Sequence, residues 1–326
     1  MPTPPAPARL AIGLRKSALS LCHAEYIRAR LLAVYPDCEI VLRGITTRGD
    51  QILDQPLANL GGKGLFIKEI EDAMVEGRAD FAVHSLKDIP MDIPAGFVLA
   101  TIPEREDPRD ALVANGYATL DALPDGAVVG TSSLRREAQL REKNPTLRIK
   151  LLRGNVNTRV RKLDEGQYDA MILAAAGMRR LQLDHRISAM LAPEDFLPAV
   201  GQGALGLECG ADRADVIAAL APLADRPTVL ATAAERAFSR RLAGSCHAPI
   251  AGYALFRGND DLWLRGLLAS RAAPRSRKSS ARPIPSACAP AASVTVAASS
   301  PRITSRPSRL ASKPRSHSSP FARNNA

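Results

Sequence analysis

Short apolar runs alternate, over the first 270 residues, with longer segments in which apolar side chains recur at helical spacing. Leu10–Leu14 is the first such run, and Ala18–Val34 is the first segment with helical spacing. The pattern then predicts strand Ile40–Leu42, helix Leu65–Glu76, strands Phe81–Val83, Val98–Ile102 and Val128–Val129, helix Ser133–Lys143, strand Ile149–Leu152, helix Thr158–Glu165 and strand Met171–Leu173. This alternation is typical of doubly wound α/β sheets, which bind ligands at the carboxyl ends of their strands.

The pattern changes after this α/β region. The turn-rich segment Pro193–Gly203 leads to a further helix, Thr228–Leu242. Two later apolar runs, Ile250–Leu255 and Leu262–Leu268, are expected to pair as a hairpin. The sequence therefore predicts an α/β body followed by a small α+β unit.

The formal net charge of +11 comes from the C-terminal part of the chain. Residues 271–326 contain nine Arg, two Lys and no acidic residue, which leaves 33 basic and 33 acidic residues in the rest. The same segment has 13 Ser and 8 Pro. We expect residues 270–326 to be a disordered basic tail, because it cannot bury enough apolar area to offset its ordering entropy. The neutral body argues against a nucleic-acid partner, which only the tail suggests.

The composition also bears on location. No apolar run approaches the roughly 18 residues that a membrane-spanning helix needs, and the sequence MPTPPAPAR lacks the regions of a secretory signal. The five cysteines do not suggest a disulfide scaffold and are expected to be reduced thiols. No Cys/His pair has zinc-ligand spacing, so we predict no metal site. We therefore expect a cytoplasmic protein without a membrane partner.

Three strand-to-helix turns carry groups that bind anions. Gly130–Arg136 combines hydroxyls and free backbone N–H groups with two guanidinium groups, Arg153 and Arg159 flank the next turn, and Arg15 and Ser17 lie at the first. The first of these motifs can also be explained by a capping serine with two solvated arginines. Together, the three turns favour a polyanionic ligand in a cleft between two lobes.

Lys87 and Asp88 follow the buried strand Phe81–Val83. A carboxylate at a strand end can exchange protons with a substrate or stabilise a developing cation. The alternative is a surface ion pair, and His84 is expected to pack beside the strand. Upstream, a glycine-rich loop contains Lys63 but lacks the spacing of a nucleotide-binding P-loop.

Cys246 lies in a loop of small residues after a helix, next to His247. An accessible thiol there can be a nucleophile or an attachment point, although most lone cysteines are inert. Cys22, Cys38 and Cys209 fall within helix or strand patterns and are expected to be small core residues.

Six motifs stand out together: VHSLKDIP at 83–90, REDPRD at 105–110, GTSSLRR at 130–136, LRGNV at 152–156, LPAVGQG at 197–203 and the loop of Cys246. Their order and spacing, from about Arg9 to Leu268, resemble those of the porphobilinogen deaminase (hydroxymethylbilane synthase) family. Its members join four porphobilinogen molecules head to tail and release ammonia at each step. They extend the chain on a dipyrromethane cofactor held by a cysteine thioether. The resemblance therefore implies a transferase of tetrapyrrole (haem-type) biosynthesis.

The resemblance implies a role for each residue that matches a family motif. Every added ring brings an acetate and a propionate, so many local cations are needed. The residues implied to bind cofactor and substrate carboxylates are Arg15, Ser17, Lys87, Thr131, Ser133, Arg135, Arg136, Arg153, Arg159 and Arg180, with Lys63 on a loop over the cleft. Asp88 matches the catalytic aspartate, which stabilises the cation left by the loss of ammonia. Cys246 matches the cysteine that carries dipyrromethane.

The resemblance also implies three domains, the first two with periplasmic-binding-protein-like folds joined by two chain crossings. Domain 1 comprises residues 8–103 and 204–222, domain 2 residues 104–203, and domain 3, a small α+β unit with Cys246, residues 226–269. We expect a monomer whose partner is porphobilinogen. The alternative is a non-catalytic two-lobed organic-anion-binding protein, which would share the fold without needing Asp88 or Cys246.

The chain departs from the family at several positions. Cys22 and His23 replace a common Trp-Gln pair, and Asn59 replaces a common lysine of the loop over the cleft. After Ala269, the expected third strand and helix give way to the Arg/Ser/Pro-rich tail, so we expect an incomplete domain 3 with an exposed sheet edge. A shifted reading frame in GC-rich DNA would produce such a change, and a genuine basic extension is the alternative.

Overall fold

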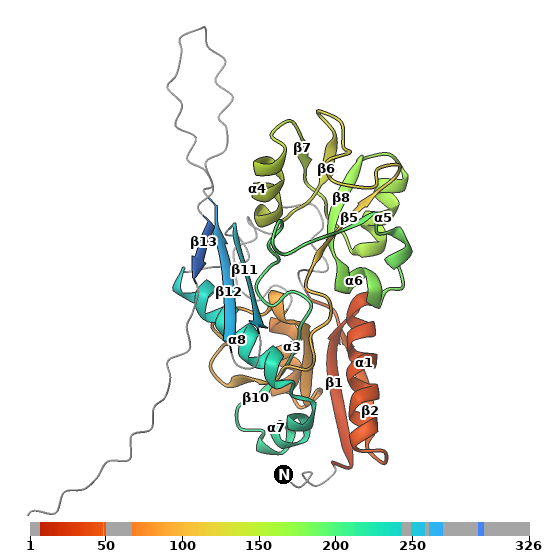
Figure 1. Cartoon of the computed structure of the whole chain (residues 1–326). Helices are drawn as coiled ribbons and strands as arrows, with labels where there is room; N and C mark the ends of the chain where they lie inside the picture. The colour runs from red at the N-terminus through yellow and green to blue at the C-terminus, as the bar shows by residue number, and fades with distance from the viewer. Residues whose placement is uncertain are drawn as a thin grey trace, which may run out of the picture.

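The computed structural model describes residues 7–47, 49, 67–242, 249–257, 261–269 and 293–296. These residues form two α/β lobes and a smaller third unit beside them (Figure 1). Each lobe is built on a five-stranded sheet, whereas the third unit combines three antiparallel strands with one long helix.

Lobe 1 contains a sheet with the strand order β2-β1-β3-β10-β4, in which β1 is parallel to both β2 and β3. Its strands are β1 (Arg9–Arg15), β2 (Glu39–Ile45), β3 (Phe81–Ser85), β4 (Phe97–Thr101) and β10 (Leu205–Gly210). Its described helices are α1 (Ala18–Val34), α3 (Lys68–Val75) and α7 (Ala214–Leu220), with the 3-10 turns η2 (Leu86–Asp88) and η4 (Ala221–Leu223).

Lobe 2 contains a sheet with the order β7-β6-β8-β5-β9, in which β6 is parallel to β7 and β8. Its strands are β5 (Asp110–Ala114), β6 (Val128–Gly130), β7 (Arg148–Lys150), β8 (Ala170–Ala174) and β9 (Ala189–Leu191). Its helices are α4 (Leu134–Lys143), α5 (Val156–Asp164) and α6 (Ala175–Arg180), with the 3-10 turn η3 (Asp184–Arg186).

The two lobes exchange one strand each. β10, which follows lobe 2 in the sequence, fills the fourth position of the lobe 1 sheet and is antiparallel to β3 and β4. β5, which follows the first four strands of lobe 1, fills the fourth position of the lobe 2 sheet and is antiparallel to β8 and β9. The chain therefore crosses between the lobes twice, and the expected class of two doubly wound lobes with a small α+β unit is confirmed.

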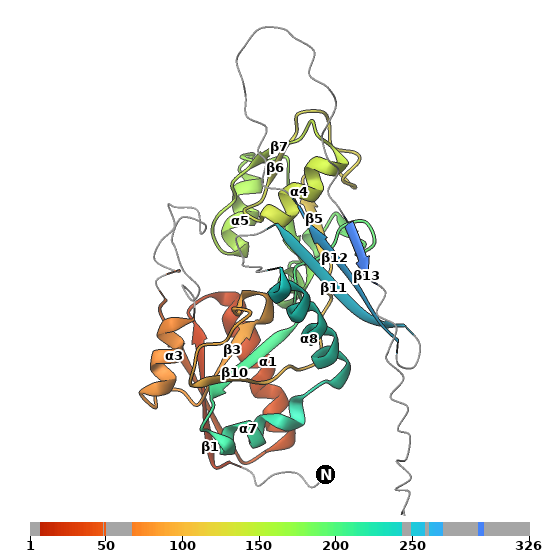
Figure 2. The same ribbon diagram turned by 90° about the vertical axis from the view of Figure 1, so that its left-hand side faces the viewer.

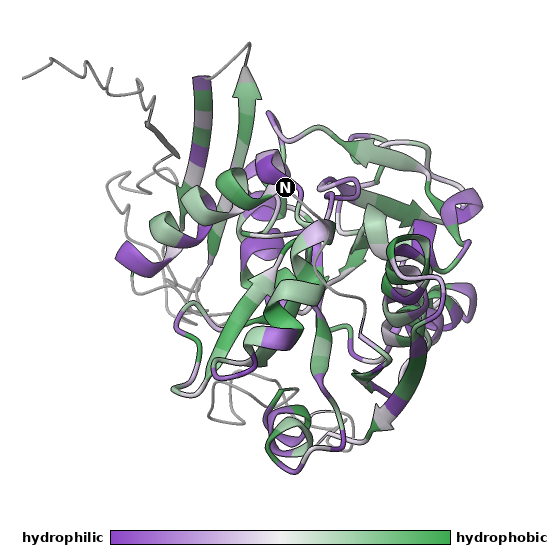
Figure 3. Cartoon of the chain, turned by 90° about the horizontal axis from the view of Figure 1, so that it is seen from below, coloured by the Kyte–Doolittle hydropathy of each residue, from purple (hydrophilic) through white to green (hydrophobic). Residues whose placement is uncertain are grey.

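The core of lobe 1 lies between its sheet and α1. Ile12, Phe81 and Leu207, from three adjacent strands, pack with Ile27 and Leu31 of the helix, and all five are fully buried. Each such burial contributes roughly 1.5–3 kcal/mol. The hydropathy colouring follows this arrangement, because the strands are largely apolar while the helices also carry polar residues (Figure 3).

α1 spans the range that the sequence analysis expected. It begins after Ser17, whose hydroxyl accepts a hydrogen bond from the Ser20 N–H at 3.2 Å and so caps the helix. Cys22 of α1 is only half-buried, which corrects the expectation of a core residue. Cys38 and Cys209 are buried, as expected. Cys22 differs because it lies off the helix face that carries the buried His23, Ala24 and Ile27.

The third unit packs the helix α8 (Arg226–Arg241) against the hairpin of β11 (Ile250–Arg257) and β12 (Asp261–Leu268) (Figure 2). Its close packing depends on a glycine. A Cβ atom at Gly266 would lie 2.1 Å from Cζ of Phe238 in α8, so no larger residue fits there without a shift. The expected hairpin is thus confirmed, with both strands longer than predicted.

β12 is not the edge that the sequence analysis expected. A third strand, β13 (Ser293–Val296), pairs antiparallel with it, Leu264 opposite Val296 and Leu267 opposite Ser293. The four residues of β13 belong to the segment 270–326, which was expected to be disordered, and they correct that expectation. The composition of the whole segment hid a short β-branched run, Val294–Val296, of the kind that favours strands. The remaining residues beyond 269 lie outside the described part of the chain.

The sequence analysis missed β5 and β10. The residues of both strands are almost all buried, so neither shows the alternation of an amphipathic strand.

Among the described residues, no single helix is long and apolar enough to span a membrane. The helical segments Ala214–Leu223 and Arg226–Arg241 pass the test of length and composition only when they are taken together, and they are bent by 110° relative to each other.

Candidate functional site

The carboxyl ends of β1 and β3 place three predicted site residues at one edge of lobe 1. β1 and β3 are parallel neighbours, with Ile12 opposite Phe81, so Arg15 at the end of β1 lies near the turn that follows β3. That turn, η2, carries Lys87 and Asp88. The Asp88 side chain is exposed, so its carboxylate is accessible to a ligand, while Lys87 is half-buried.

Buried backbone contacts hold the η2 turn in place. The side chain of Leu86 is 1% exposed, and its N–H donates to the carbonyl of Ala204 at 3.0 Å. Ala204 immediately precedes β10, the strand that returns from lobe 2. The position of Lys87 and Asp88 is thus tied to the segment that joins the lobes.

The corresponding edge of lobe 2 carries the hydroxyl-rich turn after β6. Thr131 Oγ1 accepts from the Ser133 N–H at 3.1 Å, and Ser133 Oγ accepts from the Arg136 N–H at 3.5 Å, which caps α4. Ser133 therefore acts as the helix cap that the sequence analysis allowed for this motif, and Ser17 caps α1 in the same way. Because both caps sit at strand ends, they place the first turns of α1 and α4 beside the site.

Arg135 and Arg136 are bound to a buried carboxylate. Arg135 Nη1 lies 2.7 Å from one oxygen of Asp110, and Arg136 Nη2 lies 2.8 Å from the other. Arg135 also donates to the carbonyl of Leu197, and Arg136 Nη1 donates to that of Ile172 at 2.9 Å. Asp110 is fully buried, and the two arginines are 4% and 7% exposed. The sequence analysis proposed these arginines as ligand groups and did not foresee that they also hold the core of lobe 2.

The charges in this cluster shift one another's pKa values. Burial alone would raise the pKa of Asp110, but Arg135 and Arg136 hold it well below its usual range. Arg135 in turn keeps a buried donor, Nε, without an acceptor among the described residues. A carboxylate of a bound ligand is the natural partner for such a donor, because an unsatisfied buried polar group is costly.

Cations from both lobes lie close enough to shift one another's pKa values. Burial, opposed by Asp88 and assisted by Arg136 of lobe 2, lowers the pKa of Lys87 to about 8. Burial also lowers the pKa of Arg159 to about 10, assisted by Arg136 and Arg153. Five of the predicted binding residues are therefore close enough to repel one another, namely Lys87, Arg135, Arg136, Arg153 and Arg159. A polycarboxylate would relieve this repulsion.

Gln202 joins the two lobes beneath the site. Its side-chain N–H group donates to Asp110 Oδ1 at 2.9 Å and to the carbonyl of Pro108 at 2.8 Å, while its Oε1 lies 3.5 Å from Lys87 Nζ. Gln202 is fully buried. Neither Gln202 nor Asp110 was singled out by the sequence analysis. Gln202 lies within the motif at 197–203 and Asp110 within the motif at 105–110, and these motifs could have pointed to both residues.

Arg180 links α6 of lobe 2 to lobe 1. Its Nη2 donates to the carbonyl of Gly203 at 3.1 Å, and its Nη1 lies 3.3 Å from Nε2 of His23. Lys63 and Cys246 lie outside the described residues, so their predicted roles stay predictions. Within the described part of the chain, no group of three His, Cys, Asp or Glu side chains is placed to hold a metal ion.

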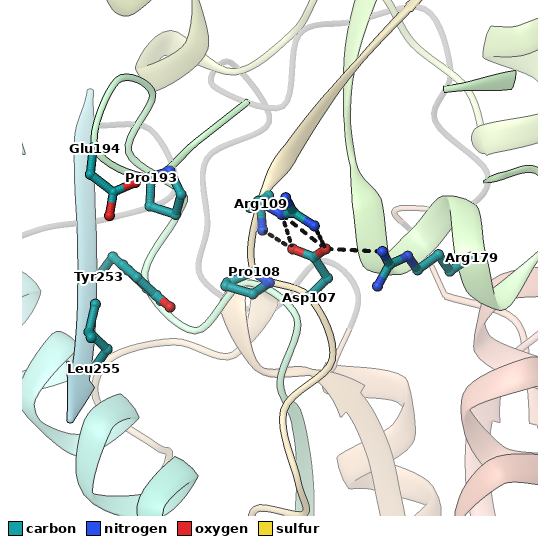
Figure 4. A pocket seen from close by; sticks show the side chains of 8 residues that line it. All are labelled: Asp107, Pro108, Arg109, Arg179, Pro193, Glu194, Tyr253 and Leu255. Carbon is teal, nitrogen blue, oxygen red and sulfur yellow. Dashed lines mark hydrogen bonds and ion pairs between the residues drawn. The ribbon is translucent and has the colours of Figure 1, made fainter. Parts of the chain in front are cut away.

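A second hollow, between lobe 2 and the third unit, differs in chemistry. It is an open pocket of about 510 Å³ beside Tyr253 of β11 (Figure 4). Asp107 contacts both of its arginines, at 2.6 Å for Arg109 and 3.3 Å for Arg179. None of the residues that line this pocket belongs to the predicted binding set.

Comparisons with known proteins bear on this site. Residues 10–218 match the sequence model of "Porphobilinogen deaminase, dipyromethane cofactor binding domain", and residues 229–295 match "Porphobilinogen deaminase, C-terminal domain". The porphobilinogen deaminase of Ralstonia nicotianae is 58% identical over 281 residues, covering 86% of this chain and 84% of that protein. That of Burkholderia thailandensis is 58% identical over 279 residues, covering 83% and 84%.

The chain is also similar, at low sequence identity, to solved structures of binding proteins. The methionine-binding protein MetQ is 13% identical with a TM-score of 0.43, covering 70% of this chain and 95% of its own. The periplasmic aliphatic sulphonate binding protein SsuA from Escherichia coli is 18% identical with a TM-score of 0.39, covering 73% and 71%.

Proposed function

The chain belongs to the porphobilinogen deaminase family, and from this premise we propose how its residues divide the work of the reaction. It is a transferase, a hydroxymethylbilane synthase of tetrapyrrole biosynthesis. The reaction joins four porphobilinogen molecules head to tail, releases ammonia at each step and yields linear hydroxymethylbilane. The proposal is carried by one observation: the exposed carboxylate of Asp88 lies beside cations that come from both lobes.

The cations bind the carboxylates of the substrate and of the growing chain. Guanidinium groups suit this task because they present paired donors to a carboxylate. The binding set comprises Arg15, Ser17, Lys63, Lys87, Thr131, Ser133, Arg135, Arg136, Arg153, Arg159 and Arg180. Arg135 and Arg136 have a second task, since they also neutralise Asp110. Their guanidinium groups are thereby fixed before any ligand arrives.

Asp88 is the catalytic residue in this proposal. When porphobilinogen loses ammonia from its aminomethyl group, the remaining pyrrole carries positive charge that it shares with its ring nitrogen. A fixed carboxylate beside that nitrogen stabilises the cation and can take the proton released when the new bond forms. Lys87, the neighbouring residue, keeps the site from accumulating negative charge when the substrate's carboxylates are near.

The family's cofactor is dipyrromethane, and the residues present suit it. Dipyrromethane supplies the primer to which porphobilinogen is added. The buried Nε donor of Arg135, which has no acceptor among the described residues, would meet one of its carboxylates. Arg136, Arg153 and Arg159 would hold the others, and Cys246 would form the thioether.

The rival interpretation, a non-catalytic organic-anion-binding protein, is not favoured by the family relationship. That rival would have no use for a carboxylate exposed among cations, because Asp88 would repel its ligand. The two-lobed shape fits either interpretation and does not separate them. We further propose that the protein acts as a monomer in the cytoplasm.

Replacement of Asp88 tests the proposal. Asp88→Asn should retain the mass of the attached cofactor but lose about 10²- to 10³-fold in the rate of hydroxymethylbilane formation. Asp92→Asn is a matched control, since Asp92 is an exposed aspartate four residues on that pairs with Arg240 at 3.0 Å. Its rate should stay near that of the wild type. A near-normal rate for Asp88→Asn would reject the catalytic role.

A further inference from the structure

His23 and Arg180 meet at the boundary between the lobes. His23 belongs to α1 of lobe 1, and Arg180 ends α6 of lobe 2; the two helices pack against each other. The His23 ring is 3% exposed, with its Nε2 3.3 Å from Nη1 of Arg180. The other terminal nitrogen of Arg180 donates to the carbonyl of Gly203 in the segment that joins the lobes. The guanidinium is thus held on two sides.

The chemistry of the pair sets the protonation state of His23. A guanidinium has only donors, so the imidazole nitrogen that faces it must be the acceptor, and the ring proton lies on Nδ1. The surroundings agree with a neutral ring. Burial, together with the positive charges of Arg180 and Lys87 and with His84, lowers the pKa of His23 to about 3. Arg180 therefore meets a fixed acceptor and no second positive charge.

We propose that His23 is a positioning residue for the reaction: its neutral Nε2 fixes the guanidinium of Arg180 across the boundary between the lobes, so that this cation is already oriented when a carboxylate binds. The inference rests on the proposed role of Arg180 in carboxylate binding. His23 matches no binding position of the family motifs. The sequence analysis noted it only as a residue that differs from the family's usual one.

Positioning and packing make different demands on this site. If His23 only filled space, an apolar side chain of similar size would replace it. If it fixes Arg180, the replacement must accept a hydrogen bond. His23→Gln keeps an acceptor in its amide oxygen, whereas His23→Leu keeps only bulk. The two variants therefore separate the two roles.

The kinetic test uses the full chain with its cofactor attached, as verified by intact mass. His23→Leu should raise the KM for porphobilinogen about tenfold, as expected for the loss of a hydrogen bond to a charged group, with a smaller change in kcat. His23→Gln should raise the KM much less. In a double-mutant cycle, His23→Leu should add little loss to Arg180→Met, because the two changes break the same contact. Equal losses for Leu and Gln, or additive losses in the cycle, would overturn the proposal.

A second measurement does not depend on activity. Nitrogen-15 spectra of the histidine rings, assigned by the signal missing from His23→Gln, should show Nε2 of His23 without a proton from pH 5 to pH 8. A protonated ring at pH 6 would overturn the inference even if the enzyme turns over normally. If instead the ring is neutral but no variant of the chain forms hydroxymethylbilane, the proposed function fails while the contact between His23 and Arg180 stands.

Ile27→Val serves as a control on the same helix. Ile27 is fully buried one turn from His23 and has no part in the contact with Arg180. The variant should lower the free energy of unfolding by about 0.5–1.5 kcal/mol and leave the KM unchanged. A KM that rises here as much as in His23→Leu would show that any disturbance of α1 has the same effect, and the proposal would fail.

Discussion

Arg105 and Glu235 form a bidentate ion pair where both lobes and the third unit meet. Nη1 and Nη2 of Arg105 lie 2.7 and 3.2 Å from the two carboxylate oxygens of Glu235, which is fully buried. The same carboxylate accepts from the N–H groups of Gly201 at 2.7 Å and Ala254 at 2.9 Å. Arg105 Nε also donates to the carbonyl of Gln202 at 2.8 Å. One carboxylate thus ties both chain crossings to the helix and hairpin of the third unit.

Glu235→Gln should destabilise the protein strongly. The change leaves the guanidinium of Arg105, only 10% exposed, without its counter-charge. Breaking a buried ion pair in this way costs about 3–5 kcal/mol. Urea unfolding would measure the loss, with Glu137→Gln as the control. Glu137 forms a part-exposed pair with Arg141 at 2.9 Å, and its loss should cost less than about 1 kcal/mol. Similar losses in both variants would contradict the central role of Glu235.

Arg135→Leu and Arg153→Leu should differ in their effect on stability. Arg135→Leu removes one of two guanidinium groups from the buried Asp110 and should cost several kcal/mol. Arg153 is half-buried at a strand end, so Arg153→Leu should mainly impair cofactor retention or chain growth. Thermal unfolding and intact mass would separate the two effects. Equal melting temperatures would argue against a structural role for the Asp110 cluster.

The rate should depend on pH through Lys87. Burial lowers the pKa of Lys87 to about 8, so the lysine loses its charge as pH rises past that value in the free enzyme. If its ammonium binds carboxylates, kcat/KM for porphobilinogen should fall above about pH 8. Lys87→Arg keeps a charge at high pH and should move this decline upward, at some cost in absolute rate. A decline that stays at the same pH in Lys87→Arg would assign it to another group.

Cys246→Ser should yield protein without the mass of dipyrromethane. The oxygen of serine is a poorer nucleophile than a thiolate and forms no thioether. Intact mass spectrometry would detect the loss, and acidic aldehyde reagent should give no pink colour. Cys209→Ser is the control, because Cys209 is fully buried in β10 and burial raises the pKa of its thiol to about 11. If only Cys209→Ser lacked the adduct, the attachment point would be Cys209 and not Cys246.

The sequence predicted the elements whose apolar pattern is simple. α1 begins and ends as expected because Ser17 caps it and one face carries Ala24, Ile27 and Leu31. β5 and β10 could not be found by alternation, because neighbours cover both faces of each strand. β13 was missed because the composition of a long segment concealed four residues.

The sequence likewise predicted only part of the candidate site. Motif matching singled out the arginines but could not show that Arg135 and Arg136 share Asp110, since that contact depends on how β5 enters the lobe 2 sheet. Gln202 and Glu235 are ordinary residues in sequence, and they become important only where the two crossings meet. His23 was noted as a difference from a motif, and only the position of α6 shows what faces it.

The exchange of β5 and β10 has a consequence for synthesis on the ribosome. Lobe 1 cannot complete its sheet until residue 210 has left the exit tunnel, by which point every strand of lobe 2 has been made. Until then, β3 and β4 of the nascent chain lack the strand that separates them, and such unpaired edges are prone to wrong pairing. A pause or truncation before Leu205 would therefore leave lobe 1 open, whereas lobe 2 could already close.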